Sequence, residues 1–128
     1  MPQAAEIQLE QRVAAARAQS LLLLAALQER IDRLGLGGDK IVIPPFESAR
    51  FTLEHDLYNG QQTLMIGFFP SRHYRIGHLL FHSDGSCFAE YHVMRRHPTR
   101  PGMFIEAVEA WVRDGEIRTD TRLAAMPK

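Results

Sequence analysis

The sequence is short of the features that most often reveal where a protein works and what it binds. Its one cysteine, Cys87, cannot form an internal disulfide, which favours a reducing compartment. An excess of charge of one sign is also lacking, because 15 basic and 15 acidic residues cancel. Bulk charge therefore gives no reason to expect a nucleic acid or a membrane as partner, and only a local basic patch could argue for one.

Long hydrophobic runs are missing as well. The most apolar segment, Leu21–Leu27, is far shorter than the roughly 20 residues that a bilayer requires. Glu6 and Glu10 precede it, where a signal peptide would carry basic residues. We therefore interpret the segment as the core side of a helix, and we expect a cytoplasmic protein without a membrane partner.

Motifs for catalysis and cofactor binding are absent too. The sequence has no Gly-x-Ser-x-Gly, Cys-x-x-Cys or His-Glu-x-x-His pattern. Residues 35–40 are rich in glycine, but they follow a helical pattern and do not lead into a helix, the reverse of what a phosphate loop requires. No cofactor is predicted, and no motif argues for an enzyme.

What the sequence does contain is a clear succession of elements. Residues 3–34 lack glycine and proline and consist largely of strong helix formers, so they predict one long helix, which Gly35 caps. Residues 50–95 alternate in the manner of strands. Residues 103–113 repeat apolar side chains at helical spacing and predict a second helix, ended by Asp114-Gly115. In a competing interpretation, Asp114-Gly115 is a type I′ turn that pairs Val112 with Ile117.

These elements predict one α+β domain over residues 1–128. A long N-terminal helix packs on a four-stranded antiparallel meander, and a short C-terminal helix completes the domain. Residues 119–128 are expected to form a mobile tail. The apolar run at residues 41–43 ends in two prolines and is a candidate edge strand.

Turn signals predict how the strands of residues 50–95 pair. Asn59-Gly60 and Asp84-Gly85 each predict a two-residue hairpin loop. Between them, a three-residue loop at residues 70–72 keeps apolar side chains on one face. The predicted cross-strand pairs include Leu57–Gln62, His55–Leu64, Leu64–His78, His82–Cys87 and His78–Tyr91.

This register gathers His55, His78 and Tyr91 in one row on the face that the N-terminal helix covers. Unpaired buried polar groups cost about 1–3 kcal/mol each, so the three side chains need partners. They form either a closed hydrogen-bonded network in the core or the lining of a ligand pocket between helix and sheet. Both interpretations stay open from the sequence.

The register also makes His82 and Cys87 cross-strand neighbours, with Cβ atoms about 5 Å apart. Such a pair could act as a thiolate–imidazole pair or as half of a metal site. Only Asp84 lies near enough to be a third ligand, whereas a structural zinc site needs four. Simple packing is therefore preferred for the pair, and no metal site is predicted.

One end of the predicted sheet is rich in arginine, because the register sets Tyr74 opposite Arg95. The candidate anion-binding residues are Arg72, Arg75, Arg95, Arg96 and Arg100. Phosphate, RNA or an acidic partner could bind there. No aromatic stacking motif is interleaved with these arginines, so a solvated end is preferred and nucleic acid is not the expected partner.

Helix length points to self-association. A helix over residues 3–34 spans about 48 Å, whereas a nine-residue strand spans about 30 Å, so the first turns overhang the sheet with their apolar side chains. The reverse face of the sheet is also partly apolar. We therefore expect a non-enzymatic accessory or protein-interaction module that acts as a homodimer. The alternatives are a small-ligand-binding protein or enzyme that uses the helix–sheet pocket, and an anion or nucleic-acid binder at the arginine-rich end.

Overall fold

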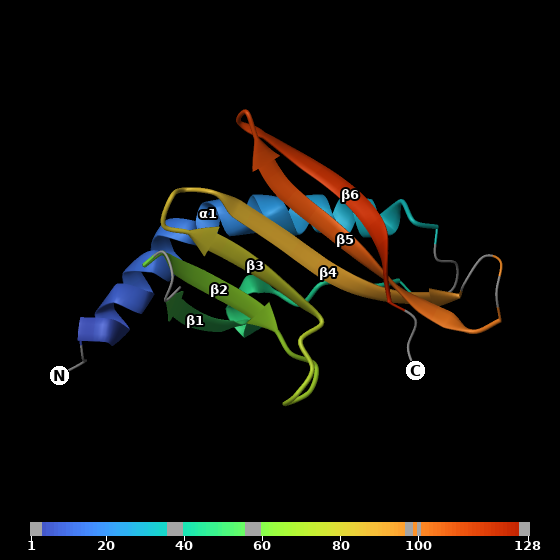
Figure 1. The fold of residues 1–128 in the computed structure, drawn as a ribbon, viewed down its shortest axis with the longest axis horizontal. Coiled ribbons are helices and arrows are strands. Elements are labelled where there is room, and N and C mark those ends of the chain that lie inside the picture. Colours follow the sequence, from blue (N-terminus) through green and yellow to red (C-terminus); the bar gives the residue numbers. More distant parts are fainter. Residues whose placement is uncertain (1–3, 36–39, 56–59, 97–98, 100, 126–128) are drawn as a thin grey trace.

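The computed structural model describes residues 4–35, 40–55, 60–96, 99 and 101–125. Over these residues the chain forms one long helix and one antiparallel sheet (Figure 1). The elements are α1, Ala4–Asp32; β1, Arg50–His55; β2, Gln62–Phe68; β3, Gly77–His82; β4, Cys87–Arg96; β5, Met103–Arg113; and β6, Glu116–Ala125. The six strands follow one another in chain order across the sheet. The α+β class with a long N-terminal helix is confirmed, but the prediction of four strands is wrong.

The long helix lies along one face of the sheet, and its N-terminal turns extend beyond the sheet's end (Figure 1). Leu23, Leu27 and Ile31 are almost fully buried against the strands. The helix ends as predicted, because the Leu34 N–H bonds the Ile31 carbonyl at 3.0 Å and Gly35 takes a φ of 63°. The spacing of its apolar residues was therefore a sound guide to the side that faces the core.

Residues 41–43 do not form the candidate edge strand. The side-chain amide of Gln28, on α1, donates to the Ile41 carbonyl at 2.8 Å and accepts from the Ile43 N–H at 2.9 Å. A single side chain thus satisfies the backbone groups that a neighbouring strand would otherwise pair. The 3₁₀ turn Phe46–Ser48 follows and buries Phe46 in the core.

The predicted C-terminal helix at residues 103–113 is wrong. That segment is strand β5, and Asp114 and Gly115, with φ values of 54° and 77°, form the turn into β6. Val112 pairs with Ile117, as the competing interpretation has it. Pairing with β4 on one side and β6 on the other outweighs the helical preference of the local sequence. Residues 119–125, predicted as tail, belong to β6, whereas 126–128 lie outside the described residues.

The first hairpin slides by two residues relative to the predicted register. His55 pairs with Gln62 instead of Leu64, and Leu53 pairs with Leu64. An even slip keeps every side chain on its predicted face, because strand side chains alternate with a period of two. Residues 56–59, which include the first half of the predicted Asn59-Gly60 turn, lie outside the described residues.

The third strand slides by an odd number of residues, which turns it over. Leu79, and not Leu80, pairs with Ala89, and Leu64 pairs with Phe81. The cause lies in the turn, where the His82 N–H bonds the Ser86 carbonyl at 2.9 Å around a three-residue loop that ends in Gly85 with a φ of 92°. A three-residue loop closed by a left-handed glycine replaces the predicted two-residue loop.

The sheet therefore has two unlike faces, which we name by their relation to α1. The inner face packs on α1 and includes the fully buried Leu64, Ile66, Leu79, Ala89 and Val108. The outer face has no helix over it within the described part of the chain (Figure 1). No helix among these residues is both long and apolar enough to cross a membrane.

Candidate functional site

The turning over of β3 separates the predicted polar row. Tyr91 stays on the inner face and is only 5% exposed. His78 points to the outer face, where it pairs with Glu90. His55 is exposed at the end of β1. The three side chains therefore form neither a common network nor a common pocket, because they lie on different faces or at the rim.

Tyr91 nevertheless borders a cleft. Its ring lies over Gly77, where an added Cβ would come within 2.5 Å of the ring atom Cδ2. The cleft has a volume of about 200 Å³ and is lined by Pro44, Ser48, Phe68, Phe69, Pro70, Ile76 and Tyr91. Burial, and secondarily the nearby Tyr74, raises the pKa of Tyr91, so its hydroxyl keeps its proton at neutral pH.

The outer face carries a charged group that sequence reasoning missed. Glu90 on β4 and Glu109 on β5 are direct cross-strand partners, and Arg122 from β6 bridges them. The Arg122 Nη2 lies 2.8 Å from Glu90 Oε1, while its Nε donates to Glu109 Oε1. His92 Nε2 lies 3.3 Å from the other oxygen of Glu90. We call Glu90, Glu109, Arg122 and His92 the outer cluster.

The outer cluster is held by a balance of charges. Like charges directly opposite each other on neighbouring strands are unfavourable, so Glu90 and Glu109 depend on the arginine between them. Hydrogen bonding to Glu109 raises the pKa of Arg122, which remains charged. Next to the cluster, burial and then the charge of Arg75 lower the pKa of His78. No group of three or more His, Cys, Asp or Glu side chains in the described ranges is arranged to hold a metal ion.

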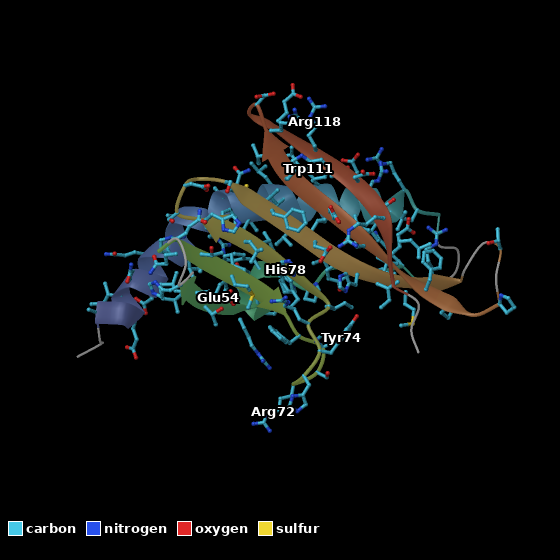
Figure 2. All side chains as sticks on the ribbon, viewed as in Figure 1. Glu54, Arg72, Tyr74, His78, Trp111 and Arg118 are labelled. Atoms are coloured by element: carbon cyan, nitrogen blue, oxygen red, sulfur yellow. The ribbon has the colours of Figure 1, made fainter. Side chains whose placement is uncertain are left out.

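An apolar row runs beside the outer cluster. Met65, Leu80, Phe88 and Trp111 are successive cross-strand neighbours from β2 to β5. Figure 2 shows Trp111 and His78 on the same uncovered side of the sheet. The type I′ turn at Asp114-Gly115 was the signal for this arrangement, since the hairpin it forms brings Arg122 beside β5.

His82 and Cys87 are not partners. Cys87 pairs with Phe81 on the inner face, whereas the His82 ring on the outer face lies 2.8 Å from the Thr63 hydroxyl. Burial raises the pKa of the Cys87 thiol, which disfavours the thiolate form. The predicted thiolate–imidazole pair therefore does not form in this structure.

The predicted arginine-rich end is dispersed. Tyr74 bridges back to Ser71 within its own turn instead of facing Arg95. Arg95 is paired with Glu106 at 2.7 Å, and Arg72 projects from the β2–β3 turn (Figure 2). Arg75 is exposed, Arg100 lies outside the described residues, and nothing is described of the Arg96 side chain. The structure gives these five residues no common site.

The side of α1 that faces away from the sheet carries apolar residues beside polar ones such as Gln11 and Glu29. Six exposed apolar residues on this side make up what we call the outward stripe: Ile7, Ala14, Ala18, Leu21, Leu22 and Ala25. Their spacing places them opposite the buried Leu23 and Leu27 on the helix surface. From Ile7 to Ala25 the stripe runs about 27 Å at 1.5 Å per residue.

Comparisons with protein-family models, with curated proteins and with solved structures found no match for this chain.

Proposed function

We propose that the chain is a non-enzymatic protein-interaction module that acts as a homodimer, and that the outward stripe of α1 is its contact surface. The observation that carries the proposal is the stripe itself. A helix on the surface of a protein normally carries polar residues on its solvent side, whereas α1 has apolar residues on both sides.

The sizes of the stripe residues favour a second copy as the partner. In an antiparallel pair with its twofold axis at Ala18, Leu22 of one copy would lie against the partner's Ala14. Leu21 would lie against the partner's Ala15. Large side chains thus meet small ones in a self-complementary way, as a twofold interface requires. Alanine also allows two helices to approach to the lower end of the usual 8–10 Å separation.

The N-terminal end of α1 fits the same arrangement. The first turns of α1, which extend beyond the sheet, would then gain packing that they lack in a single copy (Figure 1).

Analytical ultracentrifugation at micromolar concentration tests the proposal. The wild-type protein should sediment as one species whose mass is twice the 14.6 kDa of the chain. Leu21→Glu places a charge within the stripe without loss of helix propensity and should give a monomer. Met94→Glu is the matched control, because Met94 is 55% exposed on the outer sheet face.

The two variants distinguish a contact through the outward stripe from a contact through the outer sheet face. A wild-type monomer contradicts the homodimer. A dimer that Met94→Glu disrupts and Leu21→Glu leaves intact would move the contact to the outer sheet face. Far-ultraviolet circular dichroism of both variants shows whether the fold is retained, so that loss of folding is not read as loss of contact.

A further inference from the structure

Negative charge is missing from one long stretch of the chain. Between Asp56 and Asp84 the sequence has no aspartate or glutamate, while it carries Arg72 and Arg75. The even balance of charge over the whole chain therefore conceals a local excess of positive charge. At the centre of this stretch is the loop between β2 and β3, residues 69–76, which we call the basic loop.

Hydrogen bonds hold the basic loop in a defined shape. At its base, the Ile76 N–H donates to the Phe68 carbonyl at 2.9 Å. At its tip, the Tyr74 N–H donates to the Ser71 carbonyl at 3.4 Å, which closes a tight turn with Arg72 at its corner. The loop projects beyond the body of the sheet, so its side chains are accessible from solvent (Figure 1).

The arginines of the basic loop have no counter-charge. Arg72 and Arg75 are exposed, and neither forms an ion pair with a described residue. Glu90 on β4 is already engaged within the outer cluster. Burial and then the charge of Arg75 lower the pKa of His78, close to the start of β3, so the positive charge of the loop is felt by its neighbours.

An aromatic ring lies between the two arginines in the chain. Tyr74 is 42% exposed, whereas the predicted register placed it on the covered face opposite Arg95. Figure 2 shows Tyr74 and Arg72 together on the loop, away from the body of the sheet. The sequence argued against a nucleic acid because no aromatic residue was available among the arginines, and the exposed Tyr74 removes that argument.

Arginines and an exposed aromatic ring together suit single-stranded nucleic acid. A guanidinium group binds phosphate oxygens in a bidentate manner, and an aromatic side chain stacks on any base that is free of a duplex. A membrane surface is disfavoured, because residues 70–75 contain no large aliphatic side chain that could enter the lipid.

We propose that the basic loop binds single-stranded nucleic acid, with Arg72 and Arg75 on phosphates and the Tyr74 ring stacked on a base. The inference goes beyond the homodimer and is independent of it, because the loop shares no residue with the outward stripe. Two phosphate contacts predict a small association constant, whose logarithm falls by about 1.4 for each tenfold rise in salt, at about 0.7 per phosphate. Binding should therefore be measured at low salt.

Fluorescence anisotropy of a fluorescein-labelled oligouridylate of about ten nucleotides tests the proposal at about 20 mM salt. Arg72→Gln together with Arg75→Gln should weaken binding by about tenfold or more, because both phosphate contacts are lost. The matched control is Arg113→Gln together with Arg118→Gln. It removes the same charge from the β5–β6 hairpin and should leave the affinity unchanged.

Two variants of Tyr74 separate base stacking from attraction by charge alone. Tyr74→Ala should weaken binding about tenfold, whereas Tyr74→Phe keeps the ring and should bind like wild type. Far-ultraviolet circular dichroism of every variant shows that the fold is retained, so that a loss of affinity is not a loss of folding.

Several results would overturn the proposal. One is an unchanged anisotropy with wild-type protein at about 100 µM, the weak end of non-specific binding. Others are equal affinities of wild type and Tyr74→Ala, or an equal loss in the two double variants. Sedimentation with phosphatidylserine vesicles without binding of the oligonucleotide would assign the loop to a membrane surface instead. Leu21→Glu should bind the oligonucleotide with wild-type affinity per chain, so this test is unaffected by a failure of the homodimer.

Discussion

Replacing Gly77 with alanine tests the turning over of β3 directly. In the structure, Gly77 pairs with Tyr91, and an added Cβ would lie 2.5 Å from Tyr91 Cδ2 and 2.9 Å from the Glu90 carbonyl oxygen. Carbon atoms pack at about 3.5–4.0 Å, so the ring would have to move by about 1 Å or more. The carbonyl belongs to the backbone of β4 and cannot move without disturbing the sheet.

The magnitude follows from two opposing effects. Overpacking of this kind costs about 1–3 kcal/mol. Alanine also restricts the unfolded chain, which returns about 0.4–1 kcal/mol. The midpoints of these ranges leave a net loss of about 1.3 kcal/mol in the free energy of unfolding of Gly77→Ala, and the melting temperature should fall by about 4 °C for each kcal/mol.

Urea unfolding followed by Trp111 fluorescence and by circular dichroism measures the loss. Gly67→Ala on β2 is the matched control, because its Cβ would meet the Phe69 ring at 2.7 Å and the Met65 sulfur at 2.9 Å. Both are ends of side chains that can turn aside, so the loss should be smaller. If β3 kept its predicted register, the Gly77 position would point away from Tyr91. A Gly77→Ala variant as stable as wild type, or more stable, would therefore refute the reasoning.

Three further predictions concern the core, the linker and pH. Leu27→Ala should cost about 2–5 kcal/mol in urea unfolding, whereas Leu123→Ala at a half-exposed position should cost less than about 1 kcal/mol; equal losses would contradict the described packing. Gln28→Ala removes both hydrogen bonds to the linker, so the Ile43 amide should exchange with deuterium faster, and an unchanged rate would speak against the clamp. The pKa of His78 is lowered in the folded state, so the unfolded chain takes up the proton first as pH falls below about 6.5. Stability should then drop between pH 7 and 5 more steeply in wild type than in His78→Gln, and parallel pH profiles would contradict this assignment.

The sequence predicted the covered position of Tyr91, whereas it did not predict the outer cluster. Glu90, Glu109 and Arg122 come together because three strands align in one register, and Arg122 was placed in a mobile tail by the helix interpretation of residues 103–113. Tyr91 was recognised as a polar residue on the covered face, and that prediction is confirmed. The prediction for His78 is wrong, because a one-residue difference in a turn exchanges the faces of a whole strand, and His55 is exposed at the end of β1.

What the sequence determined by itself was local and periodic. Residues 4–32 are helical because their composition favours a helix throughout, and Gly35 ends the helix because a left-handed residue needs no Cβ. The inner face of α1 followed from the spacing of its apolar residues. Tertiary structure alone decided the rest. β5 is a strand because two neighbouring strands pair with it. β3 sets Leu79 on the inner face and His78 on the outer face because the loop at residues 83–85 has three residues. These choices rest on contacts between segments far apart in the chain, which local propensity does not contain.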